Sequence, residues 1–287
     1  MSKPNILIQL DTDDQPSVFD SVVAVDAGVE HLFRHHAITS ENVRERVHGA
    51  IFTRGPDDLR NTALFVGGSD VARGEQVLSA IVASFIGPLR TSVMMDSGGA
   101  NTTAAAAVLA AAKHLDLAGT TALVLAATGP VGQRVAWLLA REGASVRVAS
   151  RRLARATDVA ATISQKTQSA RISACTVGKP AELAAALEGV TLIVAAGAAG
   201  VVLLPEETLA HAGELRVAVD LNAVPPLGIA GIKVTDKAVE RQGVIYYGAI
   251  GVGGTKMKIH KAAIKALFES NDRVLDAPEI FQIGREL

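Results

Sequence analysis

The stretch Thr121-Ala-Leu-Val-Leu-Ala-Ala-Thr-Gly-Pro-Val-Gly132 decides the fold class of this chain. Residues 121–125 are short, apolar and β-branched at their start, which is typical of a buried strand. A turn over 126–129 leads to an apolar-periodic helix over 130–141, and a second strand follows over 145–149. This order predicts the first β-α-β unit of a dinucleotide-binding fold.

Small residues occupy the three glycine positions of the dinucleotide fingerprint, namely Ala127, Gly129 and Gly132. Gly129 lets the backbone approach a pyrophosphate, and Gly132 lets the helix pack close to the strand. Pro130 suits the first helical turn, where its missing N–H has no partner to lose. The free N–H groups and the positive dipole of a helix start attract phosphate. The residues expected to hold the pyrophosphate are Thr128, Gly129, Pro130, Val131 and Gly132.

The second strand ends in Ser150-Arg151-Arg152 and not in an acid. An Asp or Glu there would bind the ribose hydroxyls of NAD and would repel a ribose 2′-phosphate. A hydroxyl and two guanidinium groups bind such a phosphate, so the sequence predicts NADP. The alternative is a β-α-β unit without a nucleotide, in which the arginine pair is merely solvated. Residues of later strand-end loops that are also expected beside the cofactor are Ala196, Gly197 and Asn222.

Composition narrows the class of protein. Of 287 residues, 49% are hydrophobic and only 3% are aromatic, which suits helices packed closely on parallel sheets. The net charge of −1 gives no broad basic field for nucleic acid or a membrane surface. The single cysteine, Cys175, favours a reducing compartment, and we expect the cytoplasm. His31, His35 and His36 have no cysteine or carboxylate at ligand spacing, so no metal site is expected.

Strand and helix patterns alternate along the chain, which predicts parallel sheets with right-handed crossovers. The expected fold is α/β with two domains. An N-terminal α/β domain spans 1–105 and is completed by 259–287, and a Rossmann-type domain spans 106–258. Ligands of open parallel sheets lie outside the carboxyl ends of the strands. The loops rich in Gly, Asn and Asp at such ends are 11–17, 96–102, 197–200, 220–226 and 248–258.

Asp20, Asp96 and Lys256 are the candidate site residues outside the cofactor loops. Asp20 lies in the first turn of an otherwise apolar helix, and the alternative is a solvated helix acid. Asp96 ends a strand before a glycine-rich loop, and the alternative is a cap for the next helix. Lys256 is expected to open the last helix, which starts at residue 255 or 256. A cation there opposes the helix dipole, so another demand must place it.

Several loops resemble those of the NADP-dependent methylene-tetrahydromethanopterin dehydrogenases of bacterial one-carbon metabolism, some of which also accept methylene-tetrahydrofolate. Ala127 departs from the family, in which a glycine is usual, and makes the turn less free. The resemblance implies a pterin-binding N-terminal domain, no metal or flavin, and homo-oligomers that are trimers or larger. The stretches that carry it are Asp11-Thr-Asp with Pro16-Ser-Val-Phe-Asp20, Asp96-Ser-Gly with Asn101-Thr-Thr-Ala-Ala, Thr128-Gly-Pro-Val-Gly132, Asn222 with Pro225-Pro-Leu-Gly-Ile, and Gly248-Ala-Ile-Gly-Val-Gly-Gly-Thr-Lys-Met-Lys-Ile-His260.

The implied reaction transfers a hydride from the pterin's methylene carbon to NADP and leaves the methenyl form. No proton accompanies the hydride, so the enzyme needs positioning and water exclusion more than a general base. Asp20 and Asp96 then suit the pterin's N–H edge, and Lys256 suits a carbonyl or charge near the reacting nitrogens. Two alternatives stay open: another two-domain Rossmann NADP dehydrogenase, shikimate-like or acting on amino acids, and a non-catalytic NADP-binding protein.

Overall fold

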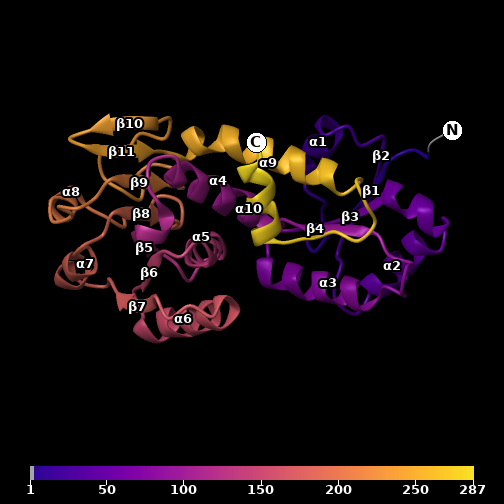
Figure 1. Ribbon diagram of the computed structural model, residues 1–287, viewed down its shortest axis with the longest axis horizontal. Coiled ribbons are helices and arrows are strands. Elements are labelled where there is room, and N and C mark those ends of the chain that lie inside the picture. The colour runs from indigo at the N-terminus through magenta and orange to yellow at the C-terminus, as the bar shows by residue number, and fades with distance from the viewer. Residues whose placement is uncertain (1–2) are drawn as a thin grey trace. The chain divides into compact units, whose positions relative to one another are not determined.

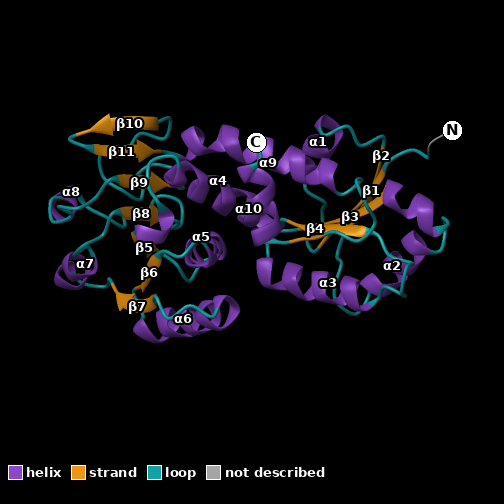
Figure 2. Ribbon diagram, viewed as in Figure 1, coloured by secondary structure: helices purple, strands orange, loops and turns teal. Residues whose placement is uncertain are grey.

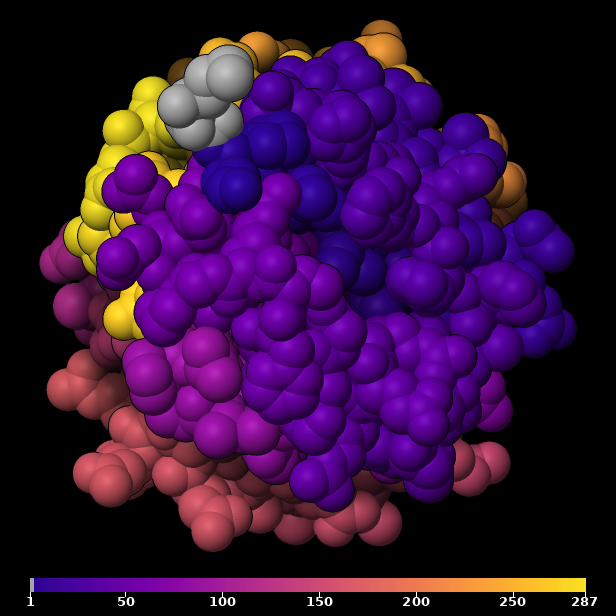
Figure 3. Space-filling view, turned by 90° about the vertical axis from the view of Figure 1, so that its right-hand side faces the viewer, coloured from indigo at the N-terminus to yellow at the C-terminus, as the bar shows by residue number. Residues whose placement is uncertain are grey.

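The computed structural model describes residues 3–287, and the chain divides into two compact units. Unit 1 runs to Thr102 and resumes at Met257–Leu287, and unit 2 is Thr103–Lys256. The strands form a separate sheet in each unit (Figure 2). Figure 3 shows the yellow C-terminal residues beside the indigo and purple N-terminal ones, as their shared unit requires. The expected divisions, after residues 105 and 258, lie slightly further along the chain.

Unit 2 is built on a seven-stranded sheet in the order β10-β11-β9-β8-β5-β6-β7. Every pair in it is parallel except the β10–β11 pair. From β7 to β11 this is the Rossmann order, with its topological switch point between β5 and β8. The bounds are β5 (Thr121–Leu125), β6 (Ser145–Ser150), β7 (Ile172–Thr176), β8 (Leu192–Ala195), β9 (Val217–Asp220), β10 (Lys237–Arg241) and β11 (Val244–Tyr247).

Helices cover both faces of the unit 2 sheet (Figure 1). One face carries α4 (Ala100–Ala112), α5 (Pro130–Arg141) and α6 (Leu153–Thr167), and the other carries α7 (Pro180–Ala186) and α8 (Glu206–Leu209). A short 3-10 helix, η3 (Leu117–Gly119), precedes β5. Because both faces are covered, the central strands are apolar throughout and do not alternate. β8, for example, is buried at every residue.

Unit 1 has a five-stranded sheet in the order β12-β4-β3-β1-β2, in which every pair is parallel. This is the second common order of doubly wound sheets, with its switch point between β1 and β3. The α/β class and the Rossmann-type sheet predicted from the sequence are therefore confirmed. The bounds are β1 (Ile6–Asp11), β2 (His31–His35), β3 (Thr62–Gly67), β4 (Ser92–Met95) and β12 (Val274–Leu275).

The helices of unit 1 also lie on both faces of its sheet (Figure 1). α2 (Val43–Ile51) and α3 (Val71–Ala83) pack on one face, where alternate strand residues such as Leu10 and Leu64 join their apolar cores. α1 (Val18–Asp26) and the C-terminal part of α9 (Ala249–Ala266) pack on the other face. The remaining elements are η1 (Pro56–Asn61), η2 (Ser97–Gly99) and α10 (Ala277–Arg285).

The start of α9 differs from the expectation. The helix begins at Ala249, so the glycine-rich stretch 248–254 is largely helical and is not a loop. A Cβ on Gly251 would lie 1.8 Å from the carbonyl oxygen of Asp236, and one on Gly248 would lie 2.1 Å from that of Lys233. These glycines thus admit a neighbouring backbone and do not form a turn. Lys256 lies inside the helix, and the dipole argument made for it does not hold.

β10 was not expected, and it makes the sheet of unit 2 mixed. β10 lies at the edge of the sheet, and its sequence, Lys-Ala-Val-Glu-Arg, is correspondingly polar. A buried strand could therefore not be recognised there from the sequence. A two-residue turn of Gln242 and Gly243, with φ values of 51° and 77°, connects it to β11. Positive φ at both positions is typical of the type I′ hairpin turn.

Candidate functional site

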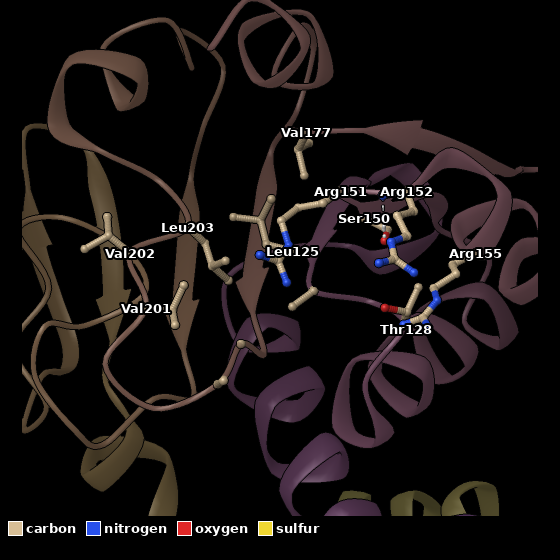
Figure 4. A pocket seen from close by; sticks show the side chains of 13 residues that line it. Leu125, Thr128, Ser150, Arg151, Arg152, Arg155, Val177, Val201, Val202 and Leu203 are labelled. Carbon is tan, nitrogen blue, oxygen red and sulfur yellow. Dashed lines mark hydrogen bonds between the residues drawn. The ribbon is translucent and has the colours of Figure 1, made fainter. Parts of the chain in front are cut away.

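A pocket of about 680 Å³ lies at the carboxyl ends of β5, β6 and β8, at the switch point of unit 2 (Figure 4). This is where ligands of open α/β sheets bind. The turn after β5, the start of α6 and the loop after β8 form its walls. Its lining residues are Leu125, Ala126, Thr128, Ser150, Arg151, Arg152, Arg155, Val177, Gly197, Ala198, Val201, Val202 and Leu203.

The turn from β5 to α5 is as tight as a dinucleotide turn must be. Ala126 adopts a φ of +55°, which costs an alanine more than a glycine. A Cβ on Gly132 would lie 2.7 Å from the carbonyl oxygen of Ala126 and 2.8 Å from the Cα of Ala127. The close helix–strand contact therefore requires Gly132, whereas Ala127 is tolerated because its φ is not positive.

The start of α5 presents free backbone donors. Gly129 is the N-cap and Pro130 the first helical residue, and the N–H of Gln133 donates to the carbonyl oxygen of Gly129 at 3.0 Å. The N–H groups of Val131 and Gly132 come before this first helical bond. Such groups, together with the helix dipole, form a phosphate site. The five residues proposed for the pyrophosphate thus lie in one turn, of which Thr128 lines the pocket.

Three arginines line the pocket, one more than the sequence analysis placed there. Arg151, Arg152 and Arg155 are all exposed, and within residues 3–287 none of them has a carboxylate in ion-pair distance. Figure 4 shows the side chains of Arg152 and Arg155 pointing toward Thr128, whereas Arg151 extends toward Leu125. Arg155 could have been found from its position, three residues after Arg152 at a helix start.

Ser150 shapes this basic rim. It is 9% exposed, and its hydroxyl oxygen accepts a hydrogen bond from the N–H of Arg152 at 3.2 Å. The hydroxyl hydrogen remains available to a ligand in the pocket. The arrangement orients one arginine backbone while it keeps a donor at the end of β6.

The other expected cofactor residues differ in their placement. Gly197 lines the pocket, and a Cβ there would meet Leu203 at 2.7 Å. Ala196 comes directly before Gly197, and its carbonyl oxygen lies 3.9 Å from the Cβ position of Gly129. Asn222 is 5% exposed, and its amide binds its own loop through Pro226 O at 3.1 Å and Val224 N at 2.9 Å. Asn222 thus stabilises a loop and does not line the pocket.

Asp96 is fully buried in unit 1 and caps the start of α4. Its Oδ1 accepts hydrogen bonds from the N–H groups of Asn101 and Thr102 at 2.9 and 3.0 Å. Its Oδ2 accepts from the hydroxyl of Thr102 at 2.6 Å and lies 3.9 Å from Nδ1 of His260. These contacts correspond to the cap that was the alternative for this residue.

Asp11 performs a similar task at the end of β1. Its Oδ1 accepts from the N–H of Asp13 at 3.0 Å, and its Oδ2 accepts from the N–H of Ser17 at 3.0 Å. Ser17 is in turn the N-cap of α1, and its hydroxyl oxygen accepts from the N–H of Asp20 at 3.2 Å. The buried strand end thereby fixes the turn of helix that carries Asp20.

Asp20 is the partly exposed carboxylate of this cluster. Burial is the main cause that raises the pKa of Asp20 from 3.8 to about 6. The nearby His260 lowers this pKa, as does a side-chain hydrogen bond of Ser17. The carboxylates of Asp96 and Asp11 raise it further. A carboxylate with a pKa near neutrality in a partly open position is a candidate for contact with a ligand.

His260, which the sequence analysis did not place in the site, lies beside Asp96, with 3.9 Å between its Nδ1 and Asp96 Oδ2. It is 0% exposed, and its ring stacks on Phe65 with centroids 5.7 Å apart and an interplanar angle of 17°. The ring of Phe19 lies 6.4 Å away. Lys256 precedes His260 by one helical turn, so the two side chains lie on the same face of α9. That spacing is the signal from which His260 could have been found.

Two negative findings concern other kinds of site. Among residues 3–287, no group of three or more His, Cys, Asp or Glu side chains could hold a metal ion. His31 and His35 lie in the edge strand β2, and His36 follows it. No helix in the same residues is long and apolar enough to cross a membrane.

Comparisons with known proteins agree with this geometry. The family described as methylene-tetrahydromethanopterin dehydrogenase, N-terminal, matches residues 18–98. The NAD(P)-dependent methylenetetrahydromethanopterin dehydrogenase of Methylorubrum extorquens AM1 is 30% identical over 94% of both chains. The chain belongs to the methylene-tetrahydromethanopterin dehydrogenase family. The bifunctional protein MdtA of the same organism is 44% identical over the full length of both chains.

Solved structures of lower identity share the fold of this family member. Quinate dehydrogenase from Corynebacterium glutamicum, solved with NAD, superposes with a TM-score of 0.55 at 13% identity. The match covers 99% of this chain and 100% of that one. At such identity the likeness shows the two-domain fold alone. The resemblance stated from the sequence is confirmed by the full-length relatives.

Proposed function

We propose that this chain is an NADP-dependent dehydrogenase that oxidises methylene-tetrahydromethanopterin, or methylene-tetrahydrofolate, to the methenyl form. One hydride passes from the methylene carbon to the nicotinamide, and the two flanking pterin nitrogens stabilise the resulting cation. The observation that carries the proposal is the phosphate pocket of unit 2, at the switch point of a chain whose full length aligns with this family. The alternative dehydrogenases and the non-catalytic protein are not favoured by these relatives.

The pocket of unit 2 suits NADP in three parts. The N–H groups of Val131 and Gly132 bind the pyrophosphate, and Gly132 permits the close approach. The ribose 2′-phosphate binds the hydroxyl of Ser150 and the guanidinium groups of Arg151 and Arg152, which form charge-assisted hydrogen bonds. The flat adenine ring suits the apolar wall, which consists of Val177, Val201, Val202 and Leu203.

Unit 1 is the pterin-binding part in this proposal. Asp20, partly exposed above the buried cluster, accepts hydrogen bonds from the amino and ring N–H groups of the pterin. Lys256, the last residue of unit 2, contacts the carrier as a cation, and Asp96 acts indirectly by holding the start of α4. Since no proton moves with the hydride, these residues bind and orient the carrier and need not exchange protons with it.

Steady-state assays of the purified chain test this function. The formation of NADPH is followed with methylene-tetrahydromethanopterin, methylene-tetrahydrofolate, quinate, shikimate and common amino acids, each with NADP and with NAD. We expect turnover with at least one methylene-pterin and a preference for NADP. Turnover with quinate, shikimate or an amino acid alone would support the other Rossmann dehydrogenases. NADP binding without turnover of any of these compounds would support a binding protein.

We further propose that the enzyme works in the cytoplasm as a homo-oligomer of three or more subunits. The single cysteine suits a reducing compartment. Light scattering coupled to gel filtration measures the oligomer mass directly, and a monomer mass at assay concentration contradicts the oligomer.

A further inference from the structure

A second cavity, of about 290 Å³, lies in unit 1 between α2 and the edge of the sheet. Ile6 and Ile8 of β1 and Phe33 of the edge strand β2 form its apolar floor. Arg46 and Gly49 of α2 line it from the other side. Because α1 packs on the opposite face of this sheet (Figure 1), the cavity is separate from the residue of α1 proposed to contact the pterin.

Two residues that line this cavity, Gly49 and Thr62, are not explained by the fold. A glycine inside a helix is less stable than an alanine, yet a Cβ on Gly49 would meet no atom within 4 Å. The fold therefore does not require a glycine there, and the missing side chain leaves the cavity open. Thr62 is 3% exposed, and its hydroxyl oxygen has no hydrogen-bond partner within residues 3–287. A buried hydroxyl without a partner is costly, and a polar ligand group would remove that cost.

Arg54 lies at the end of the cavity next to Thr62. Its Nη1 donates to the carbonyl oxygens of Pro4 at 3.1 Å and of Asn61 at 2.9 Å. These bonds use one nitrogen of the guanidinium group and leave the N–H groups of the other two for a ligand. In the part of the chain that the structure describes, no carboxylate lies within ion-pair distance of Arg54. The charge of Arg54 is therefore not balanced within the protein.

The rest of the lining favours an anion of small size. Arg46 and His35 also line the cavity, and among the described residues no acidic side chain does. Glu45 pairs with Arg46 at 3.1 Å, but its side chain is 87% exposed, so water screens this pair. A molecule of liquid water occupies about 30 Å³, so the cavity holds about ten non-hydrogen atoms. A ligand of this size with one anionic end and an apolar body matches both the charge and the floor.

We propose that this cavity binds a small apolar carboxylate. The carboxylate group accepts hydrogen bonds from the guanidinium group of Arg54 and from the hydroxyl of Thr62, and a guanidinium group binds carboxylates through two parallel N–H groups. The hydrocarbon body lies on Ile6, Ile8 and Phe33, and it covers the ring of Phe33, a residue that is 50% exposed. This site is independent of the proposed function.

The first test is the binding of octanoate to the full chain, measured by isothermal titration calorimetry. We expect a Kd of about 1 mM or lower, as is usual for a ligand of this size. Octylammonium, which has the same body and the opposite charge, should bind about tenfold more weakly or not at all. No saturable binding of octanoate at millimolar concentration overturns the proposal, and equal binding of octylammonium contradicts the choice of an anion.

A leucine at Gly49 tests whether octanoate binds in this cavity. Gly49→Leu fills the space above the apolar floor and should weaken octanoate binding by about tenfold or more. Arg44→Leu adds the same side chain to an exposed position of α2 that does not line the cavity, and it should leave the Kd unchanged. Unchanged binding in Gly49→Leu would show that octanoate binds elsewhere and would overturn the proposal.

Thr62→Val and Arg54→Gln test the carboxylate end. Thr62→Val keeps the shape of the side chain and removes its hydroxyl, and Arg54→Gln keeps an N–H donor and removes the charge. Each should weaken octanoate binding by about tenfold. The Tm of the ligand-free protein should not fall in Thr62→Val or in Gly49→Leu, because neither residue serves the fold. A lower Tm in both variants, or an unchanged Kd in both Thr62→Val and Arg54→Gln, contradicts the proposal.

Discussion

The pocket of unit 2 and the carboxylate cluster of unit 1 both lie at the carboxyl ends of parallel strands, but they hold charge in opposite ways. In the pocket, Arg151, Arg152 and Arg155 are exposed and come from five consecutive residues. In the cluster, Asp11, Asp96 and His260 are fully buried and are far apart in the sequence. The exposed arginines of the unit 2 pocket therefore take their counter-charge from a bound ligand. The buried carboxylates Asp11 and Asp96 are instead satisfied by hydrogen bonds from the protein itself.

The largest effect is expected where the charges are unpaired in the protein. Arg151→Ala with Arg152→Ala removes two contacts to the 2′-phosphate, each contributing about 1.5–3 kcal/mol. The KM for NADP should rise at least a hundredfold, while the KM for NAD changes little. Steady-state kinetics with both nucleotides measure this, with Arg44→Ala on α2 of unit 1 as the control. An unchanged KM for NADP would show that the pair is only solvated surface.

A second large effect is expected from Lys256, which shares a face of α9 with His260. If Lys256 orients the pterin, Lys256→Ala should lower kcat by about a hundredfold, the scale of a misplaced reactant. The KM for NADP should stay normal, because the phosphate site lies in the turn after β5 and at the start of α6. Lys258→Ala changes an exposed lysine on another face and should leave kcat unchanged. A normal kcat in Lys256→Ala contradicts the role, and a raised KM for NADP moves the residue to the cofactor site.

A smaller effect on the KM for NADP is expected from Arg155, and it tests whether this residue contacts the phosphate. A single guanidinium contact to a phosphate contributes about 1.5–3 kcal/mol, and Arg155 shares its phosphate with two neighbours. Arg155→Ala should therefore raise the KM for NADP by about tenfold, and Arg155→Lys should recover part of the loss. Equal affinities of Arg155→Ala for NADP and for NAD would mean that Arg155 contributes more to the 2′-phosphate contact than we expect. No change at all would place Arg155 outside the phosphate contact.

The smallest effect is a change in the free energy of unfolding, and it tests the carboxylate cluster of unit 1. The folded pKa of Asp20, about 6, lies above its ordinary value of 3.8, so the folded state binds the proton more tightly between these values. Stability contributed by this group is thus present at low pH and is lost as the pH rises to 6. Asp20→Asn should be more stable than the wild type at pH 7, by about 1–2 kcal/mol for a partly exposed group.

Urea unfolding at two pH values measures this prediction. The advantage of Asp20→Asn at neutral pH should vanish near pH 4, where the wild-type carboxyl group is protonated as well. A variant that is less stable at both values would mean that the carboxylate stabilises the fold. The same substitution should impair turnover, since active sites often carry groups that cost stability.

The contrast between the two regions also explains what could be predicted from the sequence. The elements β5 and α5 and the basic end of β6 follow from apolar periodicity, glycine spacing and charge within one short stretch. Arg155 was missed although its spacing was readable. The cap formed by Asp96 was foreseen only as an alternative, and the contact of His260 with Asp96 was not foreseen, because it arises only when β4 and α9 assemble.

The start of α9 shows a further limit of prediction from the sequence. Its glycines were taken as a loop because glycine is the usual residue of turns. In the structure Gly248 and Gly251 leave room for the carbonyl oxygens of Lys233 and Asp236. Close packing and turn formation both select glycine, and only the neighbouring backbone distinguishes them. The polar strand β10 was missed because a strand at a sheet edge buries few side chains and so lacks the apolar pattern of a buried strand.

That edge strand has a consequence for the behaviour of the protein at high concentration. A free sheet edge offers unpaired N–H and C=O groups to any other strand and is a common starting point of aggregation. β10 carries Lys237, Glu240 and Arg241 along this edge, and Arg241 is held by a bidentate ion pair with Asp236 at 2.7 and 2.8 Å. Charged side chains on a short strand oppose the addition of a further strand. The same polarity that hid β10 from the sequence analysis thus protects the sheet from pairing with a neighbouring molecule.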